Sequence, residues 1–188
     1  MLTALKHIHK EGFVHCNLDL DHVLVCLTPF GGDHFKLVDF DNARVAGSSA
    51  HPIFQNEKAK KEPYVAPEIA DTPLTESHKP TLSTAADIWS LGVMTFILRT
   101  ACLPMNRENK TGDGKPKEFD PAIIINGTQY EKIFDEDQKD FLIKCLQADP
   151  QKRATAEQLL EHSWITKNKL AREKEFAEAR EVRINFAL

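Results

Sequence analysis

The sequence predicts a mainly helical domain with two short strand segments, resembling a β-hairpin, near its start. Three observations favour this fold class. Residues 84–98 are apolar on nearly every side of a helix, and the segment from Thr155 to Gln158 has the form of a helix-capping box. Short apolar runs also flank a turn-forming segment that contains Pro29, Gly31 and Gly32.

The composition is that of a soluble globular domain. The chain has 188 residues, of which 41% are hydrophobic and 28% charged, enough for one core of ordinary size. The net charge of -4 gives no attraction to nucleic acid or to an anionic membrane, and no apolar run approaches the length of a membrane span. We therefore expect neither nucleic acid nor membrane as a partner.

The four cysteines indicate a cytoplasmic protein with free thiols. They stand at positions 16, 26, 102 and 145, without the spacing of a metal site or of a disulfide framework. The first twelve residues also lack the charged-then-apolar order of a signal peptide.

The first elements are a helix and short strands. Leu2, Leu5 and Ile8 fall at helical spacing, and Gly12 is placed to end that helix. Residues 13–27 alternate short apolar runs with polar residues, which predicts strand structure.

A second strand and a long loop follow. Residues 35–38 form a short apolar strand pattern, and residues 42–63 carry little periodicity and many small or polar side chains. We expect the latter segment to be a loop.

The second half is helical. Ser83 or Thr84 caps a helix that runs to about Leu98, and its apolar residues predict burial on all faces. Residues 104–118 form a polar loop, and an amphipathic helix over 137–146 is ended by Pro150.

The last elements are two helices. The capping box at Thr155 opens a helix toward Trp164. Residues 166–188 form a charged tail in which Lys169 pairs with Glu173 and Lys174 with Glu178, which favours a solvated helix.

Five motifs occur in a fixed order along residues 1–165. They are HCNLDLDH from His15, VDFD from Val38, YVAPE from Tyr64, DIWSLGV from Asp87 and DPQKR from Asp149. In this order they resemble the catalytic loop, the DFG turn, the APE motif and two later signatures of the eukaryotic protein kinase C-terminal lobe. The ending TAEQLLEHSWI is similar to the calmodulin-dependent branch, which includes the death-associated and giant muscle kinases.

The resemblance implies a partial kinase domain over 1–165, with the charged tail 166–188 behind it. Neither the glycine-rich G-x-G-x-x-G nor the V-A-I-K pattern of the N-terminal lobe is present in the 188 residues. We therefore expect only the helical C-lobe of a fold that is α+β as a whole.

The structural residues of the family pattern are retained. The resemblance implies that His15 packs within the catalytic loop and that Asp87 binds the backbone of that loop. It also implies that Glu68 pairs with Arg153 beneath the activation segment.

The catalytic residues of the family pattern are mostly replaced. Asn17 stands at the position of the general base, where a neutral amide cannot accept a proton. Asp19 stands at the position of the loop lysine and reverses its charge. His22 stands at the position of an asparagine that holds magnesium, for which imidazole is a poor substitute.

One magnesium ligand of the pattern remains. Asp39 is the candidate metal- and cofactor-binding residue, whereas the glycine that follows the DFG phenylalanine is replaced by Asp41. Lys61 stands where Ser/Thr kinases usually carry a threonine that bridges the catalytic Asp and Lys.

The leading hypothesis is a catalytically inactive pseudokinase that acts as a protein-interaction or regulatory module and needs no cofactor. The alternative is a Ser/Thr protein kinase of which this chain is a truncated part, transferring phosphate from Mg-ATP. A chain without an independent role, produced by truncation, is the third hypothesis. The tail has some likeness to a calmodulin-binding segment, but its many glutamates favour a solvated helix.

Overall fold

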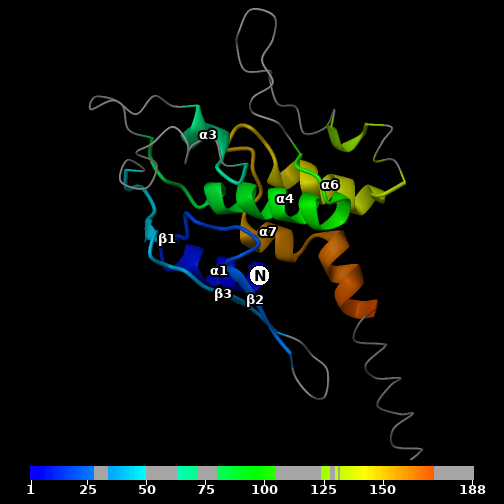
Figure 1. Cartoon of the computed structure of the whole chain (residues 1–188), viewed down its shortest axis with the longest axis horizontal. Coiled ribbons are helices and arrows are strands. Elements are labelled where there is room, and N and C mark those ends of the chain that lie inside the picture. The colour runs from blue at the N-terminus through cyan, green and yellow to red at the C-terminus, as the bar shows by residue number, and fades with distance from the viewer. Residues whose placement is uncertain are drawn as a thin grey trace, which may run out of the picture.

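The computed structural model describes residues 1–27, 34–49, 63–71, 80–104, 124–127, 130 and 132–171. Helices predominate among them, and Figure 1 shows them gathered around one central helix. The named helices are α1 (Leu2–Lys10), α3 (Pro67–Ala70), α4 (Ala85–Thr100), α6 (Glu136–Cys145) and α7 (Ala156–Leu160). A further helical segment covers residues 163–171.

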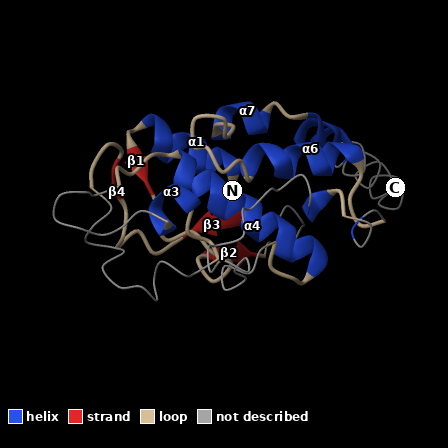
Figure 2. Cartoon of the chain, turned by 90° about the horizontal axis from the view of Figure 1, so that it is seen from above, coloured by secondary structure: helices blue, strands red, loops and turns tan. Residues whose placement is uncertain are grey.

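Among the described residues, four strands form two separate pairs. β2 (Val23–Cys26) pairs with β3 (His34–Leu37) in an antiparallel hairpin, as the apolar runs predict. β1 (Phe13–Val14) pairs with β4 (Arg44–Val45), also antiparallel, and lies at one end of the molecule in Figure 2. The turn residues predicted for the hairpin lie outside the described residues.

The pairing of β4 corrects the prediction that 42–63 is entirely loop. Arg44 and Val45 pair with β1, and Ser49 forms an isolated bridge with Thr81. Strands of two residues are too short to produce an alternating pattern, so periodicity could not reveal them. Residues 50–62, including Lys61, lie outside the described part of the chain.

The helix α1 ends where the sequence predicts. Gly12 follows its last turn with a φ of 80°, a conformation that glycine adopts without steric cost, and its N–H donates to the carbonyl of His9. Leu2 and Leu5 face the core, and Lys6 pairs with Glu157 of α7 at 2.6 Å.

The central helix α4 is buried over most of its length. Its residues from Ala86 to Met94 are all buried, including Trp89 at 0% exposure. The prediction of burial on all faces is wrong for the last turn, because Leu98 is 69% exposed where the helix extends beyond the core. The helix begins at Ala85 without a side-chain cap bond from Thr84, and it ends at Thr100.

The helix α6 packs closely against α4. A Cβ placed on Gly92 would lie 2.7 Å from Cβ of Cys145, so the absence of a side chain there lets the two helices approach. The helix begins at an Asp135–Gln138 capping box and ends at Cys145. These bounds agree within one residue with the predicted 137–146, but the chain leaves the helix at the buried Leu146, before Pro150.

The capping box at Thr155 is confirmed. Its hydroxyl accepts from the N–H of Gln158, whose side chain accepts from the N–H of Thr155. The helix ends at Leu160 rather than continuing to Trp164, and a new helical segment begins at residue 163. Trp164 packs at the edge of the core, with its ring 4.7 Å from that of Phe141.

The remaining expectations fall mostly on residues that are not described. The predicted loop over 104–118 is described only at Pro104, and the tail only as far as residue 171. The expected pairs of Lys169 with Glu173 and of Lys174 with Glu178 therefore lie outside the described residues. Within the described ranges, no helix is both long and apolar enough to cross a membrane.

Candidate functional site

The candidate site is the loop between β1 and β2, which Asp87 of α4 holds in place. Both oxygens of this buried carboxylate accept backbone hydrogen bonds, from the N–H of His15 at 2.8 Å and from that of Cys16 at 3.1 Å. This is the contact that the resemblance implies for Asp87. The nearly buried ring of His9 adds a third partner, with Nε2 lying 2.8 Å from Oδ2.

The His9 contact was not anticipated from the sequence. Asp87 and His9 lie 78 positions apart, and a histidine near the end of an amphipathic helix carries no local signal of its partner. The contact joins α1 to α4 directly below the loop.

His15 fixes the two segments of the site relative to each other. Its Nε2 lies 3.0 Å from the carbonyl oxygen of Val38, and its Nδ1 accepts from the N–H of Asn17. Its ring also packs against that of Phe40 at 4.7 Å. The histidine therefore connects the loop with the segment that carries Asp39.

The backbone of the site includes two left-handed residues that are not glycine. Cys16 has a φ of 65° and Asp39 a φ of 62°. Such conformations cost about 1–3 kcal/mol each and persist where the surroundings determine them. The bond from the Cys16 N–H to Asp87 is one such determinant.

The Cys16 thiol is not a nucleophile in this setting. Burial, followed by the nearby Asp87 carboxylate, raises the pKa of this thiol to about 12. The thiolate is the reactive form of cysteine, and a pKa this high keeps it negligible at neutral pH.

One oxygen of Asp39 lies close to the side chains of both Asn17 and His22. The amide Nδ2 of Asn17 donates to Oδ2 of Asp39 at 2.7 Å, and Nε2 of His22 lies 3.1 Å from the same oxygen. The other ring nitrogen of His22 lies 2.8 Å from the carbonyl oxygen of Asn17. The three candidate residues therefore bond to one another.

The side chain of Asp19 bonds to the backbone of its own loop. Its Oδ1 accepts from the N–H of Asp21 at 2.9 Å and from that of His22 at 3.0 Å. An aspartate side chain that accepts from the N–H two residues ahead stabilises a turn. The residue at the lysine position of the family pattern thus has a local structural contact.

A hollow of about 630 Å³ opens beside the loop. Residues 16–21 line one side of it, and Tyr64, Ile69 and the first half of α4 line another. The hydroxyl of Ser90 on α4 donates to the carbonyl of Tyr64 at 2.8 Å, which joins the two segments that line this second side.

The pair of Glu68 and Arg153 lies at the start of α4. The guanidinium binds both carboxylate oxygens at 2.9 Å and donates further to the carbonyls of Gln147 and Ala85. Its carbon also lies 5.2 Å from the Trp89 ring centre. This is the pairing implied by the resemblance, and it connects α3, α4 and the segment before α7.

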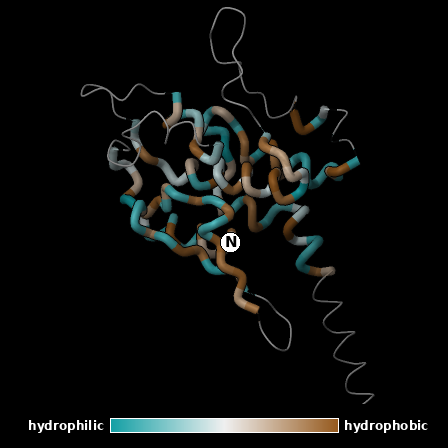
Figure 3. The backbone as a smooth tube through the Cα atoms, viewed as in Figure 1, coloured by the Kyte–Doolittle hydropathy of each residue, from teal (hydrophilic) through white to brown (hydrophobic). Residues whose placement is uncertain are grey.

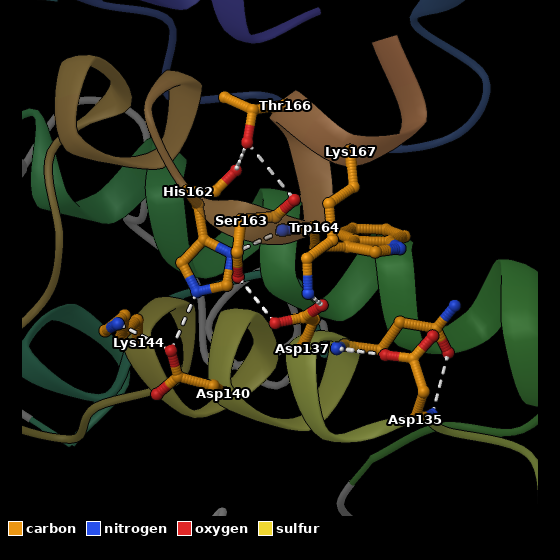
Figure 4. A network of polar contacts seen from close by, with 10 residues as sticks. Asp135, Asp137, Asp140, Lys144, His162, Ser163, Trp164, Thr166 and Lys167 are labelled. Carbon is orange, nitrogen blue, oxygen red and sulfur yellow. Dashed lines mark hydrogen bonds and ion pairs between the residues drawn. The ribbon is translucent and has the colours of Figure 1, made fainter. Parts of the chain in front are cut away.

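A second polar network holds the segment 163–171 against α6 (Figure 4). Asp137 accepts from Lys167 and from the Ser163 hydroxyl, and these hydrogen bonds, above all the one from Lys167, lower the pKa of its carboxyl. Asp140 lies 2.8 Å from the His162 ring, and its bond from Lys144 is the largest cause of its own lowered pKa. Both carboxylates therefore remain charged into the acidic range.

The sequence pattern of the protein kinase domain matches residues 1–165 of the chain. Serine/threonine-protein kinase 17A of Oryctolagus cuniculus is 32% identical over 173 residues, which are 90% of this chain and 40% of that protein. The calcium/calmodulin-dependent protein kinase cmkA of Emericella nidulans is 32% identical over 88% of this chain and 37% of its own length.

A solved structure is similar over the same part of the chain. The structure of the Rad53 kinase domain and SCD2 with AMPPNP is 28% identical, with a TM-score of 0.61. The alignment covers 87% of this chain and 55% of that one. The chain thus spans less than half the length of these two curated relatives and about half of the solved chain.

Proposed function

The chain belongs to the protein kinase family and has its fold, and from this premise we propose that it is a pseudokinase module, transferring no phosphate and acting through protein partners. In this proposal residues 1–165 are the kinase-like lobe and residues 166–188 a charged tail, whose start is bound to α6 through Lys167 and Asp137. The four free thiols support a cytoplasmic location.

The observation that carries the proposal is the contact between Asn17 and Asp39. A carboxylate only accepts hydrogen bonds, so the amide nitrogen of Asn17 must be the atom that faces it at 2.7 Å. The residue at the general-base position is therefore a donor, and a neutral amide takes no proton from a substrate hydroxyl. Loss of a positioned base typically lowers the rate by ~10²–10⁴-fold.

Asp19 adds to the loss of transfer. Phosphoryl transfer depends on positive groups that stabilise the charge of the transferring phosphate. Asp19 brings a negative charge instead, and one of its oxygens is bound to the loop backbone. An anionic nucleotide is therefore repelled where a kinase would attract it.

The retained scaffold supports a role in binding. Asp87 and the pair of Glu68 and Arg153 keep the contacts that organise the lobe. The open hollow beside the loop offers a partner protein a surface that catalysis no longer needs.

A second candidate function is a Ser/Thr protein kinase of which this chain is a part. The retained Asp39 favours it, because this residue is the magnesium ligand of the family pattern. In that case Mg-ATP would be the cofactor, and the part of the domain that this chain does not contain would complete the nucleotide site.

A transfer assay with radiolabelled Mg-ATP and a mixture of Ser/Thr peptides tests the proposal. We expect the native chain to give no more product than a heat-denatured sample. Transfer that the substitution Asp39→Asn abolishes, while Asn168→Asp leaves it intact, would contradict the proposal and establish the kinase instead.

A further inference from the structure

We infer that the Asn17 amide and the His22 imidazole take the place of a divalent cation at Asp39, so that protein groups alone close the loop. The inference deepens the proposed function and rests on it. It gives Asn17 and His22 a structural role, in addition to the loss of catalysis that their presence causes.

Both side chains bind the oxygen that a cation would need. Oδ2 of Asp39 accepts a hydrogen bond from Nδ2 of Asn17 at 2.7 Å and lies 3.1 Å from Nε2 of His22. A cation binds a carboxylate through its lone pairs, and here two nitrogen groups already occupy that side of the oxygen. The Asn17 amide also points its hydrogens at this oxygen.

His22 also connects the loop with the segment that carries Asp39. Its Nδ1 lies 2.8 Å from the Asn17 carbonyl oxygen and 3.0 Å from Oδ1 of Asp19, while its Nε2 reaches Asp39. The side chain of His22 is only 23% exposed, so its ring is held between these acceptors. One imidazole therefore links the loop to the DFG-like segment.

The donor set does not fit magnesium. Magnesium takes oxygen ligands in near-ideal octahedral geometry, whereas the groups around Asp39 are an amide nitrogen and an imidazole. In the part of the chain that the structure describes, no group of three or more His, Cys, Asp or Glu side chains is arranged to hold a metal ion. The magnesium that the family pattern implies is thus not accommodated by these residues.

A single isosteric change reverses the chemistry of the contact. Asn17→Asp replaces the donor at 2.7 Å with a carboxylate oxygen, which sets two like charges against each other. A divalent cation relieves this repulsion. Adding His22→Asn removes the imidazole and supplies an oxygen ligand.

The experiment measures the thermal midpoint and the free Mn²⁺ signal by electron paramagnetic resonance during titration with MnCl₂. The native chain is expected to bind no Mn²⁺ and to keep its midpoint. The double variant Asn17→Asp/His22→Asn should bind Mn²⁺, with a midpoint rise of roughly 5–10 °C at a concentration about 100 times its Kd. Asn168→Asp, the same isosteric change at an amide that donates to the Trp164 carbonyl, is the matched control and should bind none.

Two results would overturn the inference. One is Mn²⁺ binding by the native chain that Asp39→Asn abolishes. The other is a folded double variant that still binds no Mn²⁺; if that variant fails to fold, Asn17→Asp alone is titrated and judged by the same signal. Phosphate transfer by the native chain would instead contradict the proposed function, so the two failures are distinguishable.

Discussion

Two aspartates, Asp87 and Asp39, organise the contacts of the candidate site. Asp87 uses both oxygens to hold the backbone of the loop, whereas one oxygen of Asp39 accepts from Asn17 and lies 3.1 Å from the ring of His22. The difference between them is burial, since Asp87 is 1% exposed and the side chain of Asp39 is 32% exposed. When a buried acceptor is lost, its donors have no hydrogen-bond partner, because water cannot reach them. Asp87 therefore matters more for folding than Asp39.

Asp87→Ala should therefore lower the free energy of unfolding by about 3–5 kcal/mol, because it leaves two backbone N–H groups and the His9 ring without an acceptor. Asn17→Ala removes one donor from a partly exposed carboxylate and should cost about 1 kcal/mol. Urea unfolding followed by circular dichroism compares them. Equal midpoints for the two variants would show that Asp87 does not hold the loop.

Helices α4 and α6 approach each other at Gly92. The nearest atoms to a Cβ at this position would be Cβ of Cys145 at 2.7 Å and Cδ2 of Leu146 at 2.8 Å. The first is attached directly to a backbone, so it can move away only if the helix moves. Both neighbours are fully buried.

Gly92→Ala should destabilise the protein by about 1–3 kcal/mol through overpacking. Alanine is by itself the better helix former by about 0.5–1 kcal/mol, so the sign of the effect tests the packing directly. Chemical denaturation of Gly92→Ala is compared with that of Thr95→Ala, a half-buried position of the same helix. A Gly92→Ala variant more stable than the native chain would contradict the close approach.

The molecule as a whole exposes apolar side chains on the β2–β3 hairpin. Leu24, Val25 and Phe35 are each about half exposed, and Leu27 is 78% exposed. Figure 3 shows the hydrophobic colour reaching the described end of this hairpin. Exposed apolar side chains gathered on one hairpin promote association in water.

Leu27→Lys should accordingly reduce self-association, since it places a charge on the most exposed apolar residue of the hairpin. Sedimentation velocity over a range of concentrations measures the effect. Leu170→Lys, at an exposed leucine of the segment 163–171, serves as the control. If both variants associate like the native chain, the hairpin is not the contact surface.

Several elements were predictable because their signals are local. The capping box of α7 depends on Thr155 and Gln158, three residues apart, and the end of α1 depends on one glycine. The box at Asp135 is equally local, because Gln138 stands three residues after it. The exposed last turn of α4 was not predictable, because the pattern of apolar residues does not show how far the core extends along a helix.

The sequence alone determined the family and the chemical type of the residue at each catalytic position, because motif order and residue identity are properties of the chain. Only the tertiary structure decided which other residues they contact. Asn17 and Asp39 lie 22 positions apart, and His9 and Asp87 lie 78 apart. Contacts over such separations arise from the packing of α1, the loop and α4 around one core, which no local pattern records.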